Sequence, residues 1–65
     1  MGQKTKKKPV TGRFTIWAED EFGDIFPAKE THIGTASEGI TQIQRLVDRG
    51  GYDKEIIDIW ARAKS

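Results

Sequence analysis

Residues 35–50 place their apolar side chains three or four positions apart, a spacing that gathers them on one face of an amphipathic helix. Thr35 and Glu38 have the spacing of a capping box at the start of this helix, and Gly50 is its expected end. Gly39 is unfavourable inside it, because glycine costs about 1 kcal/mol relative to alanine in a helix. An isolated helix of this length is marginal in water, so its apolar face needs a sheet to pack against. That face consists of Ala36, Ile40, Ile43, Leu46 and Val47.

Two stretches before this helix have the alternating pattern of strands. Residues 13–19 alternate and are rich in aromatic and β-branched side chains, which predicts a first strand. Residues 20–24 read as a turn that contains Gly23, and residues 25–33 as a second strand that pairs back as a hairpin. Pro27 cannot donate a hydrogen bond to a ladder, so we expect the second strand at an edge of the sheet. On the first strand Phe14, Ile16 and Ala18 share one side, and Thr15, Trp17 and Glu19 share the other.

Residues 54–62 fit two patterns. As a strand they place Ile57 and Ile59 on one face and Trp60 on the other; as a helix they would begin at Asp53 and present Ile56 and Ile57 in one stripe. The β-branched run and the preceding glycine pair favour the strand.

These elements predict an α+β fold, a small ββαβ domain with a three-stranded sheet of order 2-1-3 and one helix on one face. A right-handed crossover places the last strand beside the first, which leaves the proline-containing strand at an edge. Residues 1–12 are polar and basic, with too little apolar surface to offset the entropy of ordering, and are expected to form a disordered arm. Residues 13–65 form the single domain. The helix should cover Phe14, Ile16, Ile57 and Ile59.

The composition limits where the protein acts and how its core is held. The chain has 65 residues and no cysteine, so neither a disulfide nor a zinc–thiolate site can stabilise it. It lacks an apolar run long enough to span a bilayer, and no apolar segment follows the N-terminal lysines as in a secretory signal. We therefore expect a cytoplasmic protein with no membrane partner. A core this small also leaves room for self-association as a homodimer.

Charge is distributed unevenly along the chain, although its formal sum is +1. All charged side chains among residues 1–13 are basic, whereas residues 14–30 carry a net negative charge. The basic arm can bind the phosphates of nucleic acid, or it can be a solvated tail that keeps the protein soluble. The candidate nucleic-acid-binding residues are Lys4, Lys6, Lys7, Lys8 and Arg13.

The face of the sheet opposite the helix carries the residue types that anchor protein interfaces. Trp17, Trp60 and Arg62 are expected there, with Glu19 and Asp58 beside them. This pattern predicts a docking surface, although the two tryptophans can also pack on each other across neighbouring strands to cover the sheet. Stacking on nucleic-acid bases is a third interpretation, opposed by the neighbouring acidic side chains.

The turn between the first two strands is acidic. A metal site is not expected, because the spacing lacks the alternation of a calcium loop. The turn can instead dock on a basic groove of a partner that otherwise holds nucleic acid, or it can be a soluble hairpin tip. The residues in question are Glu19, Asp20, Glu21 and Asp24.

Catalysis has little support in the sequence. His32 is the single histidine, and no nucleophile, metal triad or glycine-rich phosphate loop accompanies it. We expect His32 to be a partly exposed residue of the edge strand near Glu30. The chain is therefore predicted to be no enzyme and to use no cofactor.

The order of elements resembles small phage proteins that take over the host, such as the podophage inhibitors of host RNA polymerase. The resemblance covers the layout of residues 13–64: a hairpin, a helix capped at Thr35, and a last strand after a glycine turn. It implies a protein that acts in the bacterial cytoplasm by blocking a larger host protein, and it assigns no site residue. The expected function is thus a non-catalytic binding protein that modulates or inhibits a host machine such as RNA polymerase. The alternative is a nucleic-acid-binding protein that uses the lysine arm.

Overall fold

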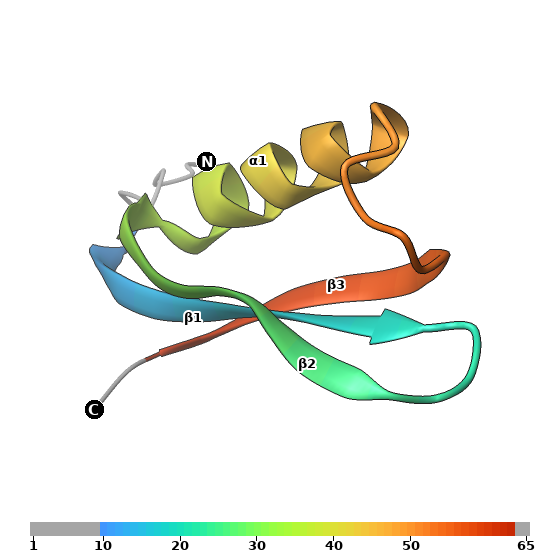
Figure 1. Ribbon diagram of the computed structural model, residues 1–65. Coiled ribbons are helices and arrows are strands. Elements are labelled where there is room, and N and C mark those ends of the chain that lie inside the picture. Colours follow the sequence, from blue (N-terminus) through green and yellow to red (C-terminus); the bar gives the residue numbers. More distant parts are fainter. Residues whose placement is uncertain (1–9, 64–65) are drawn as a thin grey trace, which may run out of the picture.

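The computed structural model describes residues 10–63 and has the predicted ββαβ architecture (Figure 1). Its three strands form one antiparallel sheet of order β2-β1-β3, with one helix lying across one face. The turn between β1 and β2 and the loop that leads into β3 lie at the same end of the molecule. The elements are β1 (Thr11–Asp20), β2 (Ile25–Thr35), α1 (Ala36–Asp48) and β3 (Ile56–Ala63).

β1 and β2 are longer than expected, because they extend to Thr11 and Thr35. Thr11 and Gly12 pair with Thr35 and Gly34, so they belong to β1 and not to an arm. The expectation of disorder otherwise falls on residues 1–9, which lie outside the described residues. The last element is a strand paired along β1, so the helical alternative for residues 54–62 is wrong.

Both ends of α1 are closed as the sequence predicts. The Glu38 N–H donates to the Thr35 hydroxyl at 3.1 Å, and the Thr35 N–H donates to the Glu38 carboxylate at 3.0 Å. The Thr35 N–H and the Thr35 hydroxyl, which lies 2.9 Å from the same carboxylate oxygen, hold the pKa of Glu38 below its ordinary value, against the opposing effect of desolvation. At the other end Gly50, with φ 75°, and Gly51 donate to the carbonyls of Val47 and Leu46, as in a Schellman motif.

Among residues 10–63 there is no helix long and apolar enough to cross a membrane.

The helix and the sheet meet at a glycine. Gly39 is buried, and a Cβ atom placed on it would lie 2.7 Å from Ile16 Cδ1 and 3.0 Å from the His32 ring. The residue that is unfavourable for the helix alone is therefore the residue that lets α1 approach β1 and β2. Around this contact the side chains of Ile16, Ala18 and Ile43 are buried.

Two residues expected in the core are outside it. The pairing of β1 with β3 shifts between Glu19 and Asp20, so that Asp20 lies opposite Ile56 and Ile57 is the extra residue of a bulge. Ile57 is consequently 64% exposed. Leu46 lies at the edge of the apolar stripe in the last turn of α1 and is 43% exposed.

Replacing Gly39 by alanine should destabilise the protein by about 1–3 kcal/mol, because overpacking at the helix–sheet contact outweighs the gain in helix propensity. Urea unfolding of the G39A variant measures this. Ser37→Ala, at an exposed position of the same helix, is the control and should be neutral or stabilising. In an Ile16→Val background, which lacks the Cδ1 atom, G39A should cost less. A stabilising G39A would contradict the close contact.

Candidate functional site

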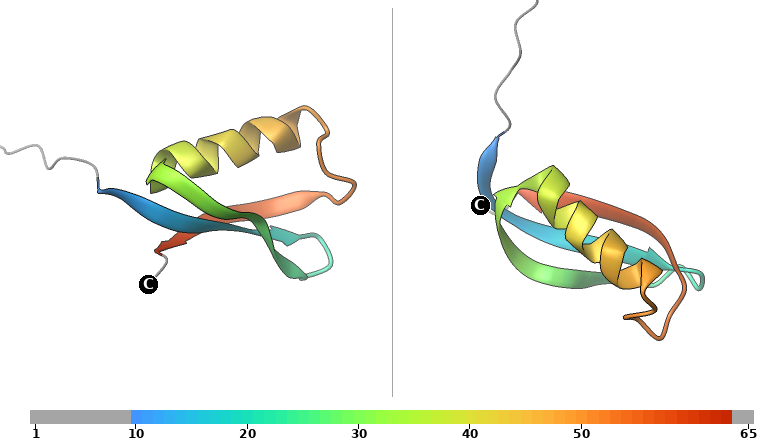
Figure 2. Two further views of the ribbon diagram at one scale, coloured as in Figure 1. Left: turned by 60° about the vertical axis from the view of Figure 1, so that its left-hand side comes forward. Right: turned by 90° about the horizontal axis from the view of Figure 1, so that it is seen from above.

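The face of the sheet opposite α1 has no covering element among the described residues (Figure 2). At its centre the partners of Trp17 are Pro27 on β2 and Trp60 on β3, which places the three side chains in one row across the sheet. Directly opposed residues of an antiparallel sheet lie on the same face, and Trp17 alternates with the buried Ile16 and Ala18. Both tryptophans are half-buried. Trp17 and Trp60 are therefore cross-strand partners on the open face, where both were expected.

Two isoleucines of β2 are also exposed on this face. Ile25 lies opposite Glu19 and is 57% exposed, and Ile33 lies opposite Arg13 and is 74% exposed. We call the set Trp17, Trp60, Pro27 and Ile25 the open-face patch. The sequence pattern did not place Pro27 and Ile25 on this surface, because their position beside Trp17 follows from pairing shifts in β2 that no local pattern reveals.

Charges on the open face are separated along the strands. Glu19 and Asp58 are cross-strand partners on the side of the β1–β2 turn. On the opposite side of the tryptophans Arg62 lies opposite Thr15, and Arg13 follows along β1. The open face thus has an acidic end at Glu19 and Asp58 and a basic end at Arg13 and Arg62, on either side of the two tryptophans.

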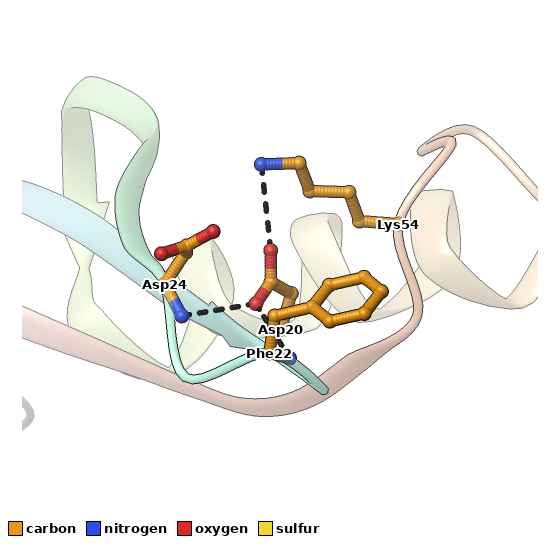
Figure 3. Close-up of polar contacts among 4 residues, drawn as sticks. All are labelled: Asp20, Phe22, Asp24 and Lys54. Carbon is orange, nitrogen blue, oxygen red and sulfur yellow. Dashed lines mark hydrogen bonds and ion pairs between the residues drawn. The ribbon is translucent and has the colours of Figure 1, made fainter.

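The acidic end is built on the buried carboxylate of Asp20 (Figure 3). Asp20 Oδ1 accepts hydrogen bonds from the N–H groups of Phe22 at 2.9 Å and Asp24 at 3.0 Å, which shapes the turn. Asp20 Oδ2 lies 3.4 Å from Lys54 Nζ, so an ion pair ties the turn to the loop before β3. Burial alone would raise the pKa of Asp20, but the two N–H donors and the Lys54 ammonium together hold that pKa below its ordinary value.

Asp20 was proposed to contact a partner together with Glu19, Glu21 and Asp24, but it is buried. Its side chain has no exposed surface, so it holds the turn from within and does not face solvent. Glu21 and Asp24 are exposed on the turn, and Glu19 is half-buried on the open face. The tip of the turn is Phe22, which is also exposed.

Glu21 has an acidic neighbour that the sequence did not indicate. The Glu21 N–H donates to the Glu55 carbonyl at 3.0 Å, which brings the two side chains together. A hydrogen bond with the Glu55 side chain, followed by desolvation and repulsion, raises the pKa of Glu21 above its ordinary value. Together with the Glu19–Asp58 pair, this end of the molecule holds two pairs of neighbouring acids.

The loop before β3 is also fastened by aromatic contacts. The rings of Phe26 and Tyr52 lie 6.0 Å apart, Lys54 Nζ lies 5.6 Å from the centre of the Phe26 ring, and the Tyr52 hydroxyl donates to the Ala28 carbonyl at 3.3 Å. Phe26, Tyr52, Asp53 and Lys54 line an open cleft of about 380 Å³. These contacts connect the hairpin to the loop and so fix the position of the acidic end.

The expectation of a partly exposed His32 is wrong. Its side chain is only 5% exposed, because it lies opposite Phe14 on the helix side of the sheet and against Gly39. Its Nε2 atom has no hydrogen-bond partner among the described residues. Within residues 10–63 no group of three or more His, Asp or Glu side chains is placed to hold a metal ion.

The candidate nucleic-acid-binding residues are only partly placed. Lys4, Lys6, Lys7 and Lys8 lie outside the described residues, and Arg13 is exposed at the basic end of the open face.

Comparison with known proteins finds no matching family model, no similar curated protein and no similar solved structure.

Asp20→Asn should lower the stability of the protein at neutral pH. Because the folded state depresses the pKa of Asp20, the stability from its ionised form is present above the ordinary pKa of 3.8 and is lost as the pH falls through the lower folded value. The urea midpoint of the variant should therefore approach that of the parent at acid pH. Asp24→Asn, an exposed change of equal charge in the same turn, should show a smaller loss; equal losses would contradict this role of Asp20.

Glu21→Gln should raise stability at neutral pH. Because the folded state raises the pKa of Glu21, folding becomes less favourable as the pH rises through that value and both carboxyls ionise. Thermal unfolding at neutral pH measures the gain, and Glu30→Gln, an exposed acid on β2, controls for the change in net charge. The interpretation fails if E21Q gives no larger increase than E30Q.

Proposed function

We propose that this protein is a non-catalytic binding module that docks on a larger protein through the open-face patch. The observation that carries the proposal is the uncovered row of Pro27, Trp17 and Trp60 at the centre of the sheet. Tryptophan is enriched among residues that dominate binding energy. Arg62 lies two residues after Trp60 on the same face of β3, where it can add a charged anchor.

Further apolar exposure on the open face supports the same surface. Ile25 and Ile33 contribute large apolar side chains that the fold leaves in water. Contiguous apolar surface rimmed by charge is typical of interaction sites in small proteins. The rim here is acidic on one side of the tryptophans and basic on the other, so it can orient a partner as well as attract it.

The acidic end indicates the charge of the partner. Neighbouring acids repel each other, and Glu19 with Asp58 and Glu21 with Glu55 form such pairs at one end of the sheet. A cationic partner surface would relieve this repulsion on binding. Basic grooves of this kind occur on proteins that handle nucleic acid, so the proposed partner is a host protein of that class, such as the RNA polymerase suggested by the phage-like layout.

Nucleic acid itself is the second candidate. Arg13 and Arg62 lie at one end of the open face beside Trp60, which is an arrangement suited to a phosphate and a stacked base. The acids Glu19 and Asp58 on the same face oppose it. Protein docking is therefore the function that the surface supports better.

Capture from a nuclease-treated bacterial lysate, with three immobilised variants, tests this proposal. The parent and Gln44→Ala, a change on the exposed side of α1, should retain the same partner protein in stoichiometric amount. Trp60→Ala should lose it, because truncating a central aromatic anchor weakens binding by about tenfold or more. Glu19→Gln with Asp58→Asn should weaken capture as well and reduce its dependence on salt.

Each variant must first give a folded far-ultraviolet spectrum and an unchanged unfolding transition shape. Capture of the same proteins by all variants would contradict docking through the open face. If nucleic acid is retained without nuclease and no protein is retained with it, the function is nucleic-acid binding. Truncation of residues 2–8 should then abolish retention, with an affinity that falls steeply with salt.

A further inference from the structure

The two edges of the sheet differ in how they are protected. β2 carries Pro27, and its pairing with β1 shifts twice, devices that discourage another strand from joining an edge. β3 is the opposite edge, and it contains neither proline nor glycine. From Asp58 to Ala63 it pairs regularly with β1, so this part of the edge contains no bulge.

A side-chain contact shows which backbone groups of β3 face outward. The Ile59 N–H donates to its neighbour's carboxylate, Asp58 Oδ1, at 2.9 Å and so faces away from β1. Because successive residues of a strand alternate in direction, the Ala61 N–H also faces outward, whereas Trp60 and Arg62 face β1. The free edge therefore carries the N–H and C=O groups of Ile59 and Ala61. In the single chain Asp58 holds the Ile59 N–H and must release it before a second strand can pair there.

The sequence of this edge is complementary to itself. When a second β3 is laid antiparallel with Trp60 opposite Trp60, Asp58 comes opposite Arg62, and Ile59 comes opposite Ala61. In this register the outward-facing residues Ile59 and Ala61 form the hydrogen-bonded pairs. Asp58 and Arg62 form non-hydrogen-bonded pairs, in which side chains lie closest.

We propose that the protein forms a homodimer in which β3 pairs antiparallel with β3 of a second copy, about a two-fold axis at Trp60. The pairing joins two three-stranded sheets into one continuous sheet. Each Asp58 meets Arg62 of the second copy, so this contact occurs twice, as off-axis contacts do in an isologous interface. This inference rests on the edge of the sheet and does not depend on the docking function.

The charge pairing also offsets a repulsion between two acidic side chains within the single chain. Asp58 lies opposite Glu19 on its other side, so within one molecule it has an acidic cross-strand neighbour. An arginine from the second copy offsets that repulsion. The dimer further aligns the tryptophan pairs of both copies in one row across the open face, which doubles the length of the apolar surface.

Two charge-reversal variants test the dimer and its register. Asp58→Arg places arginine opposite Arg62 of the second copy, and Arg62→Asp places aspartate opposite Asp58. Each should weaken self-association by about tenfold or more, measured by sedimentation equilibrium from about 10 μM to about 1 mM. Mixing D58R with R62D restores opposite charges at both contacts, so a heterodimer should form from the two weakly associating proteins.

Folding does not explain this pattern, because D58R places an arginine opposite Glu19 and should not destabilise the single chain. Hydrogen exchange gives an independent readout in the parent: with rising concentration the amides of Ile59 and Ala61 should gain protection, while those of Trp60 and Arg62 should not. A parent that stays monomeric over the whole range overturns the proposal. So does self-association that the charge reversals leave unchanged, or a mixture that fails to recover it.

Discussion

The close approach of α1 to the sheet at Gly39 is the contact on which the rest of this structure depends. A side chain at this position would meet Ile16 and the ring of His32, so only glycine allows the helix to lie this near. The contact gives the small core its packing and commits Phe14, Ile16 and Ala18 to the helix side. By alternation along β1 it also commits Trp17 to the other side.

That commitment produces a surface with three features in one place: an aromatic row, separated charges and a free strand edge. Trp60 belongs to the row and is the centre of the outer edge of β3. Asp20, buried beneath the acidic end, holds the turn and the loop before β3 together through backbone N–H groups and Lys54. The acids around it are therefore displayed on a fixed frame, which favours binding without a large cost of ordering.

The features that sequence predicted are those with local causes. Each of these signals involves residues that are close together in the sequence: the capping box of Thr35 and Glu38, the glycine that ends α1 and the alternation of β1. Together they led to the correct topology. Ile57, His32 and Asp20 were placed wrongly or incompletely, because their positions depend on shifts in strand pairing and on contacts from distant segments. A bulge exchanges the faces of Ile56 and Ile57 without a signal in local composition.

The face on which the tryptophans lie is the central claim, and acrylamide quenching of their fluorescence at high dilution tests it most directly. Trp17 and Trp60 are the only two tryptophans in the chain, so the emission reports on this face alone. Both indoles should be quenched readily in the folded protein, and G39A, to the extent that it folds, should not bury them. Emission that is protected from acrylamide until the protein unfolds would place them in the core and contradict the account.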